Sequence, residues 1–283
     1  MTEATIDVMV ERMHAGGVSV PERDALAVEE PLEIQLDATT GSQSLRKTIS
    51  VTMRTPGRDA ELAVGFLFTE GIIADRAQIE HVSDPDGAAN LVCVRLTADA
   101  TVDLDRLARH FYTTSSCGVC GKTAIEALRT TSRYPLPAGE PVVDAALIHR
   151  LPRALRAAQA IFESTGGLHA SALFDTAGRL HSVREDVGRH NALDKVIGAE
   201  LLAMRLPAHD KVLVVSGRAS FELVQKAVMA GIPILVAVGA PSSLAVHLAT
   251  CAGMTLAGFA RDGRFNVYAG TERVRPHMPA KQR

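Results

Sequence analysis

The sequence predicts an α/β fold, α+β overall, in which a small N-terminal α+β domain precedes a larger domain whose sheet is covered by helices on both faces. Two observations support it. From about residue 190 onward, helical segments alternate with apolar strands, which is typical of a sheet buried on both sides. Before residue 110, short alternating strands accompany one helical segment. With 283 residues, 47% of them hydrophobic, the chain can bury the cores of two such domains.

The composition excludes several classes of protein. The net charge is −2 and no run of Lys and Arg occurs, so no nucleic-acid partner is expected. The first 17 residues carry acids and lack the apolar stretch of an export signal, so we expect a cytoplasmic protein. Residues 227–260 contain no Asp, Glu, Lys or Arg, but glycines and prolines divide them into pieces too short to span a membrane. No membrane partner is expected.

The N-terminal part is predicted to contain an arm and the small domain. Residues 1–30 show no clear period and are expected to form a loosely attached arm. Three later segments have the pattern of strands, namely LEIQLD at 32–37, TISVTM at 48–53 and NLVCVRL at 90–96. Between the second and third, Asp59 can cap a helix that Gly71 ends. Residues 31–110 are therefore assigned to the small α+β domain.

The C-terminal part is predicted to be the larger domain. Residues 111–145 hold a cysteine pair, a short helix and the connector YPLPAGEP, whose three prolines make it stiff. Residues 146–283 are assigned to the larger domain, and within them HASALF and GRLHSV are predicted to form a hairpin around Asp175–Gly178. The segments that follow alternate between the predicted helices NALDKVIGAELLAM, FELVQKAVMA and SLAVHLATCA and the predicted strands KVLVVS, IPILVAV and MTLAGFA.

The pair Cys117 and Cys120 in SSCGVCGK is the strongest chemical signal. A zinc site needs three or four protein ligands, and the HxE motif that accompanies a PCxxC in nucleobase deaminases is absent, so no metal is predicted. Polar neighbours, Lys122 and the start of a predicted helix favour an exposed loop with an accessible thiolate. A thiolate attacks sulfur in a persulfide as it does in a disulfide. Sulfur carriage and dithiol redox cycling therefore both remain open. The other cysteines, Cys93 and Cys251, have apolar neighbours and are predicted to be core residues.

A charged segment, REDVGRHNALDK at 184–195, marks the start of a predicted helix. Asn191 is placed to cap it, with Asp194 in its first turn. Charges paired at a solvated helix start would explain Glu185 and Asp194. A helix N-terminus also attracts phosphate, and the residues that bring positive charge to it are Arg189, His190 and Lys195.

Polar strand ends predict a nucleotide-sized site in the larger domain. VVSGRASFELVQKA leads from a strand through Ser216 and Arg218 into a helix, and VGAPSSLAV repeats this geometry one strand later. Such strand-to-helix turns bind phosphates in α/β sheets. FARDGRFNVY places Arg261 and Arg264 after the last strand, where a charged hairpin turn is the structural alternative. In GGLHAS, two glycines before His169 allow a close backbone approach.

Together these segments resemble the FdhD family of sulfur carrier proteins, which formate dehydrogenases need to become active. The matching stretches run in family order over roughly residues 30–270 and are FTEGI, SSCGVCGK, GGLHAS, REDVGRHNALDKVIG, SGRASFELVQKA, GIPI, APSSLAV and GFARDGRFNVY. The resemblance implies a C-terminal three-layer αβα domain of cytidine-deaminase-like topology and a homodimer.

The resemblance also implies a reaction. A persulfide received from a cysteine desulfurase on the CxxC loop passes to the molybdenum or tungsten of bis-molybdopterin guanine dinucleotide, which GDP can mimic. Cys117 and Cys120 would be the catalytic residues. The family's cofactor-contacting stretch falls on Phe259, Ala260, Arg261, Asp262, Gly263 and Arg264.

Further cofactor contacts are inferred from charge and strand geometry, and they come from Arg189, His190, Ser216 and Arg218. Two other function classes remain. One is a CxxC dithiol oxidoreductase, and the other is a nucleotide- or cofactor-binding chaperone without sulfur chemistry.

Overall fold

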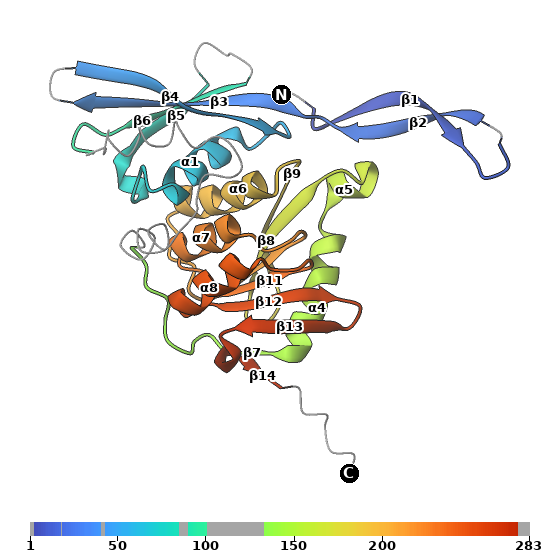
Figure 1. The fold of residues 1–283 in the computed structure, drawn as a ribbon. Coiled ribbons are helices and arrows are strands. Elements are labelled where there is room, and N and C mark those ends of the chain that lie inside the picture. The colour runs from blue at the N-terminus through green and yellow to red at the C-terminus, as the bar shows by residue number, and fades with distance from the viewer. Residues whose placement is uncertain (1–2, 18, 41–42, 85–89, 101–132, 277–283) are drawn as a thin grey trace.

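The computed structural model of the protein describes residues 3–17, 19–40, 43–84, 90–100 and 133–276. These residues form a long β-hairpin, a small sheet with one helix, and a larger sheet with helices on both faces (Figure 1). None of the helices within these ranges is long and apolar enough to cross a membrane.

The N-terminal hairpin consists of β1 (Thr5–Met13) and β2 (Ser19–Ala27), paired antiparallel so that Thr5 faces Ala27. It projects from the rest of the molecule (Figure 1). Large apolar side chains on it, such as Met9 and Met13, are exposed. Because neither face of this ribbon is buried, no alternation is imposed on its sequence, and the sequence shows no period there.

The small sheet has the strand order β4-β3-β6-β5. Its strands are β3 (Glu30–Thr40), β4 (Gln43–Arg54), β5 (Ile79–Ser83) and β6 (Leu91–Leu96). The three strands predicted in this part of the chain are confirmed, and β5 is an addition. Leu32, Ile34 and Leu36 are buried on one face, in the same cluster as the apolar side chains of α1 (Asp59–Thr69).

The predicted cap of α1 is wrong at its start. Asp59 is the first helical residue, and Arg58 occupies the cap position with a left-handed φ of 62°. The Asp59 carboxylate instead accepts two hydrogen bonds of 3.0 Å from the buried guanidinium of Arg54. It therefore does not cap the backbone N–H groups at the start of the helix. At the other end Gly71 adopts φ 69° and donates to the carbonyl of Phe68 at 2.9 Å. The chain therefore turns at Gly71, as predicted.

The larger sheet has the order β13-β12-β11-β10-β8-β9, in which the pairs β10–β11 and β11–β12 are parallel and the other neighbouring pairs are antiparallel. Its strands are β8 (His169–Asp175), β9 (Leu180–Asp186), β10 (Lys211–Val215), β11 (Ile234–Ala237), β12 (Thr255–Arg261) and β13 (Arg264–Ala269). The predicted hairpin of β8 and β9 and the later strands are confirmed. Two short strands, β7 (Val143–Asp144) and β14 (Val274–Arg275), pair separately.

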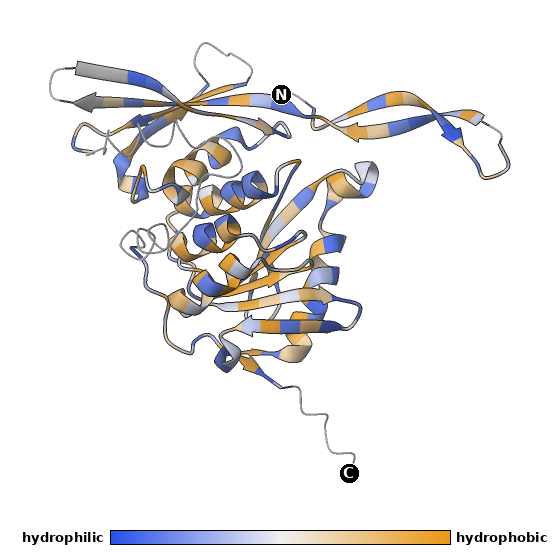
Figure 2. Cartoon of the chain, in the orientation of Figure 1, coloured by the Kyte–Doolittle hydropathy of each residue, from blue (hydrophilic) through white to orange (hydrophobic). Residues whose placement is uncertain are grey.

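Helices cover both faces of this sheet. One face carries α6 (Arg189–Leu202), α7 (Phe221–Met229) and α8 (Ser243–Ala252), and the other carries α4 (Ala145–Ala157), which α5 (Ala160–Thr165) follows. Strand β10 shows the alternation, because Leu213 belongs to the α6–α8 side and Val212 to the α4 side. Hydrophobic residues are concentrated in the central strands of this sheet, such as β10 and β11 (Figure 2). The predicted three layers are present, and the cytidine-deaminase-like topology stays a prediction.

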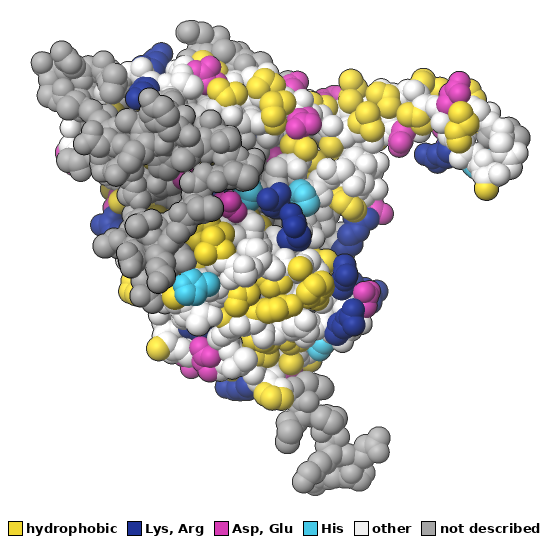
Figure 3. All heavy atoms as spheres, viewed as in Figure 1, with side chains coloured by type: hydrophobic (Ala, Val, Ile, Leu, Met, Phe, Trp, Pro, Cys, Tyr) yellow, Lys and Arg dark blue, Asp and Glu magenta, His cyan; other side chains and the backbone are white. Residues whose placement is uncertain are grey.

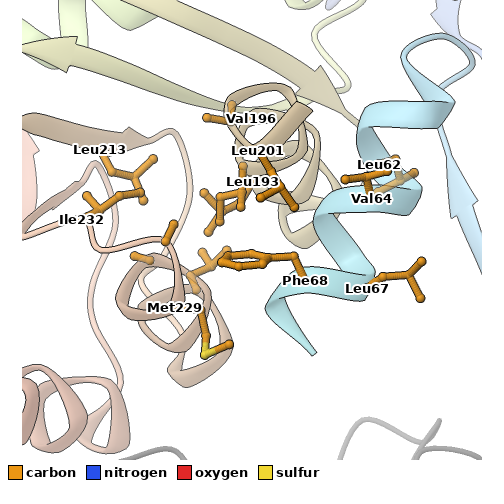
Figure 4. Close-up of a cluster of buried hydrophobic side chains, with 14 of the residues drawn as sticks. Leu62, Val64, Leu67, Phe68, Leu193, Val196, Leu201, Leu213, Met229 and Ile232 are labelled. Carbon is orange, nitrogen blue, oxygen red and sulfur yellow. The ribbon is translucent and has the colours of Figure 1, made fainter. Parts of the chain in front are cut away.

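The small sheet and the larger one share a core through the contact of α1 with α6. A Cβ atom on Gly65 of α1 would lie 1.9 Å from the carbonyl oxygen of Asp194, and one on Gly198 of α6 would lie 1.8 Å from that of Glu61. The two backbones therefore touch where they cross, which only glycine allows. Beside this crossing, Phe68 points from α1 toward Leu193 of α6 and Met229 of α7 (Figure 4).

Charged side chains buried at the same junction are paired. Lys226 of α7 lies 2.9 Å from Asp194 of α6 and donates to the Thr69 hydroxyl of α1 at 2.8 Å. Burial raises the pKa of Asp194 to about 6, and the attraction of Lys226 opposes that rise. A buried charge that loses its partner is strongly destabilising, so this pair favours a single arrangement of the three helices.

Replacing Gly198 by Ala should separate α1 from α6 and destabilise the whole fold. Overpacking costs about 1–3 kcal/mol, which at roughly 2–4 °C per kcal/mol lowers Tm by roughly 2–12 °C. Thermal unfolding followed by circular dichroism measures the change. The control is Gly16→Ala, whose Cβ meets no atom within 4 Å. Equal Tm values for the two variants would contradict the close crossing.

Candidate functional site

The carboxyl ends of β10, β11 and β12 meet at one edge of the larger sheet. The loop after β10 is joined to the loop after β11, because Ala219 N–H donates to the carbonyl of Ala240 at 3.2 Å and Ser242 N–H donates to that of Ala219 at 3.0 Å. Phe259 at the end of β12 donates to Gly239 at 3.0 Å. The two polar strand ends found in the sequence therefore lie side by side. Such an edge is where open α/β sheets bind ligands.

The loop after β10 is fixed on one side to β8. Ser216 N–H donates to the carbonyl of Ala170 at 3.0 Å, and the Ser216 hydroxyl oxygen accepts from Ala170 N–H at 2.9 Å. Arg218 follows with its side chain exposed. A Cβ on Gly239 would lie 3.1 Å from the Arg218 Cα, so the next loop crosses closely beneath this arginine. Ser216 is thus held in place while Arg218 can reach outward.

The start of α6 lies beside this loop. His190 Nε2 is 3.3 Å from the Ser220 hydroxyl and 3.8 Å from a Glu222 carboxylate oxygen. On the face drawn in Figure 3, Lys or Arg and His side chains gather between the two sheets, next to a strip of hydrophobic side chains. The structure therefore brings Arg189 and His190 to the strand ends that carry Ser216 and Arg218.

The predicted cap of α6 is wrong. Gly188 holds the cap position and α6 begins at Arg189, so Asn191 lies inside the first turn. Its amide nitrogen donates to the carbonyl of Met53 at 2.7 Å and to Asp186 at 3.1 Å. Asn191 therefore connects α6 to the small sheet, a long-range contact that its local sequence does not reveal.

The prediction that Lys195 adds positive charge for phosphate is also wrong. Lys195 is 2% exposed, lies 2.7 Å from Asp186 and donates to the carbonyl of Thr55 at 2.8 Å. Asp194 is paired, as predicted, but it is buried rather than solvated. Glu185 is also engaged, because it accepts from two backbone N–H groups at the start of α5. Of the cationic group, only Arg189 and His190 remain at the surface of the site.

Two imidazoles at this edge are held in the neutral form. Burial lowers the pKa of His190 to about 4, with further lowering by the positive charges of Arg189 and Lys226. Burial, and then Arg189, also lower the pKa of His169. The Nε atom of Arg189 is buried and has no hydrogen-bond partner among the described residues. At neutral pH the fixed positive charge here is therefore that of arginine, and each neutral histidine ring offers one hydrogen-bond donor and one acceptor.

The stretch Phe259–Arg264 forms a tight hairpin turn between β12 and β13. Asp262 and Gly263 both have left-handed φ values, 53° and 72°, as a type I′ turn requires. Ala260 is buried, whereas the residues exposed on this turn are Arg261, Asp262, Gly263 and Arg264. The charged hairpin considered for this stretch is present, and its contact with a cofactor stays a prediction.

Phe259 is the strained residue of this stretch, with φ 51°. The Arg261 guanidinium lies 5.9 Å from the centre of its ring. A hollow of about 200 Å³ is lined by Phe259, Arg264 and Asn266. Strained backbone in a non-glycine residue persists where the surrounding structure imposes it, which occurs frequently at ligand sites.

A larger cavity of about 530 Å³ lies between the α4–α5 segment and the ends of β10 and β11. Its lining includes Leu155, Gln159, Phe162, His169, Ser216 and Val238. The wall formed by α4 and α5 was not predicted from the sequence. The glycines before His169 in GGLHAS were a usable signal, since Gly166 and Gly167 also line the cavity.

The cysteines divide into two groups. Cys117 and Cys120 lie outside the described residues. Cys93 is buried, as predicted, and burial raises the pKa of its thiol. Cys251 was predicted to be a core residue, but it is only partly buried, and its Sγ lies 3.8 Å from His247 Nε2 on the outer side of α8. That prediction is wrong because the apolar neighbours of Cys251 in the sequence point to the other side of the helix.

A family model and individual relatives match most of this chain. Residues 27–275 match the model of the FdhD/NarQ family. The chain is 50% identical over 271 residues to a sulfur carrier protein FdhD of Streptomyces coelicolor, covering 93% of each chain. It is 48% identical over 262 residues to a sulfur carrier protein FdhD of Mycobacterium tuberculosis, covering 89% of this chain and 92% of the relative.

A solved structure is similar over nearly the whole chain. It is a crystal structure described as a formate dehydrogenase accessory protein from Desulfotalea psychrophila. The TM-score is 0.73 and the sequences are 26% identical, with 96% of this chain and all of that chain covered.

The neutral state of His190 can be measured directly. We expect an NMR titration to give a pKa of about 4, and Arg189→Gln should raise it because one repelling charge is removed. The folded pKa is below the ordinary value of 6.5. The folded protein therefore binds fewer protons between these values, and its stability should fall as the pH drops from about 6.5 to about 4. A pKa near 6.5 in the unaltered protein would contradict this account.

Proposed function

We propose that this chain, which belongs to the FdhD/NarQ family, is a sulfur carrier that supports formate dehydrogenase by delivering sulfur to its molybdenum- or tungsten-containing cofactor. One observation carries the proposal. The chain is half identical, over 93% of its length, to a sulfur carrier relative, and its pair CGVC supplies two thiols for the sulfur. The reaction belongs in the cytoplasm, between a cysteine desulfurase that supplies the sulfur and formate dehydrogenase, which receives the cofactor.

The chemistry is a transfer of sulfane sulfur between thiols. The thiolate of Cys117 or Cys120 attacks the outer sulfur of a persulfide on the desulfurase, the S–S bond of that persulfide breaks, and a new persulfide forms on the carrier. This uptake consumes no external oxidant or reductant. Release of the outer sulfur at the sulfide level takes up two electrons, which the other thiol of the pair supplies by forming a disulfide between Cys117 and Cys120. Lys122 beside the pair favours the thiolate that this attack needs.

The sulfur acceptor, bis-molybdopterin guanine dinucleotide, is assigned to the edge where β10, β11 and β12 end. It is a substrate of this reaction, with phosphates that need cationic and N–H donors. Arg189, Arg218, Arg261 and Arg264 offer guanidinium groups there, and bidentate arginine suits phosphate. Ser216 and the neutral His190 add polar contacts. The protein is expected to work as a homodimer.

Changing Cys117 and Cys120 together to Ala should abolish sulfur uptake. After incubation with a cysteine desulfurase and cysteine, the unaltered protein should gain the mass of one sulfur atom and the double variant none, because no thiolate remains in the pair. Intact-mass spectrometry provides the measurement, and Cys251→Ala, which removes a partly exposed thiol on α8, is the matched control.

Formate dehydrogenase activity in cells that depend on this protein should also be lost with the double variant. A disulfide without any persulfide would favour the dithiol oxidoreductase. Normal activity with the double variant would favour a chaperone that does no sulfur chemistry.

Replacing Arg261 and Arg264 by Ala should weaken GDP binding at least about tenfold, equivalent to roughly 1.4 kcal/mol. Each guanidinium that contacts a phosphate contributes a charge-assisted hydrogen bond of about 1.5–3 kcal/mol. Titration calorimetry at one salt concentration measures this. The control replaces Arg12 and Arg23, two exposed arginines of the N-terminal β1–β2 hairpin, by Ala. Both double variants then have the same net charge. Unchanged affinity in the Arg261 and Arg264 variant would place the phosphates elsewhere.

A further inference from the structure

The cavity between α4–α5 and the strand ends has the size and walls of a small-molecule site. Its volume of about 530 Å³ lies within the range of about 300–1,000 Å³ that is usual for such pockets. Apolar side chains, among them Leu155, Phe162 and Val238, supply much of the wall. Polar side chains at the cavity are few and come from α4–α5, β8 and the loop after β10. An apolar pocket with few polar groups suits a flat ring better than a phosphate.

One of those polar groups is a buried amide that lacks a partner. Gln159 lines the cavity and is 4% exposed, and its Nε2 has no hydrogen-bond partner among the described residues. A buried donor without an acceptor costs about 1–3 kcal/mol. A ligand that offers an oxygen acceptor to this amide would recover that cost. The group is therefore suited to recognise a carbonyl on a ring.

The rim next to Gln159 carries a stacking pair. The Arg156 guanidinium lies 4.1 Å from the centre of the Phe162 ring, and both side chains line the cavity. Arg156 is also 3.4 Å from Glu163, which holds it over the ring. A planar guanidinium and an aromatic ring both present flat faces on which a heteroaromatic ring can stack.

The inner end of the cavity adds polar groups at the proposed cofactor edge. The Ser216 hydroxyl oxygen already accepts from Ala170 N–H, so its proton is left for a ligand. His169 lies beside Gly217, with its Nδ1 only 3.4 Å from where a Cβ on that glycine would stand. Its depressed pKa keeps it neutral. Val238, another lining residue, immediately precedes Gly239, whose carbonyl accepts a hydrogen bond from Phe259 N–H. The cavity thus adjoins the edge assigned to the phosphates.

We propose that this cavity binds a fused heteroaromatic ring through its oxo-pyrimidine edge, with Gln159 as the donor to the ring carbonyl. Guanine and pterin share that edge, and both occur in the cofactor named above, so the proposal rests on the proposed function and adds a specificity-determining residue to it. Adenine presents an amino donor where guanine presents a carbonyl acceptor, so Gln159 favours guanine in the orientation that turns its amide nitrogen toward the ring.

The test compares the affinities of GDP, ADP and unsubstituted pterin for the full-length protein and its variants, by calorimetry at one salt concentration. Gln159→Leu should lose at least about tenfold in affinity for GDP or for pterin, the equivalent of one hydrogen bond of roughly 1.4 kcal/mol. Gln159→Glu, which exchanges a donor for an acceptor, should reduce the preference for GDP over ADP. The ligand that depends on Gln159 identifies which ring occupies the cavity.

Two controls separate binding from folding. Gln225→Leu removes an amide from α7, away from the cavity lining, and should change neither affinity. Because the Gln159 Nε2 makes no bond to the described protein, Gln159→Leu should keep or raise Tm, which a structural role would not allow. Unaltered affinity of Gln159→Leu for both GDP and pterin would overturn the proposal. Sulfur uptake by Cys117 and Cys120 is measured separately, so it could still succeed in that case.

Discussion

The crossing of α1 and α6 at Gly65 and Gly198 determines how the two parts of this molecule fit together. Each glycine faces a backbone carbonyl of the other helix at a distance that no Cβ could occupy. The close approach lets Phe68 reach the side chains of α6 and α7 (Figure 4). One continuous core therefore includes the small sheet and one face of the larger sheet. The buried pair of Lys226 and Asp194, with Thr69, adds a polar requirement for the same arrangement.

The same helix carries this constraint to the site. Residues along α6 contact α1, while its first turn places Arg189 and His190 beside the loop after β10. Asn191 bonds to Met53 and Lys195 to Thr55, so the small sheet fixes the end of α6 that faces the site. The small sheet is thus part of what positions the polar edge, although it supplies none of the side chains assigned to the ligand. A change at Gly198 would therefore alter both stability and the geometry at His190.

Much of this arrangement could be predicted from local sequence, and what could not depends on contacts between distant residues. Alternating apolar residues gave the strands of both sheets, and the turn residues gave the β8–β9 hairpin and the bend at Gly71. The roles of Asn191 and Lys195 were mistaken because their partners, Met53, Thr55 and Asp186, come mostly from the other sheet. The cavity at Gln159 was missed because its wall combines α4–α5 with strand ends about 50 residues or more away in sequence. Such a surface leaves no periodic signal in either segment.

The central functional claim is that sulfur held on the CxxC pair moves to the cofactor bound at the sheet edge. The most direct measurement loads the protein with radiolabelled sulfur from a desulfurase, removes the desulfurase and adds bis-molybdopterin guanine dinucleotide. The account predicts that the label leaves the protein and is recovered with the cofactor, and that excess GDP slows this transfer. Label that stays on the protein, or that leaves only when a thiol reductant is added, would contradict it.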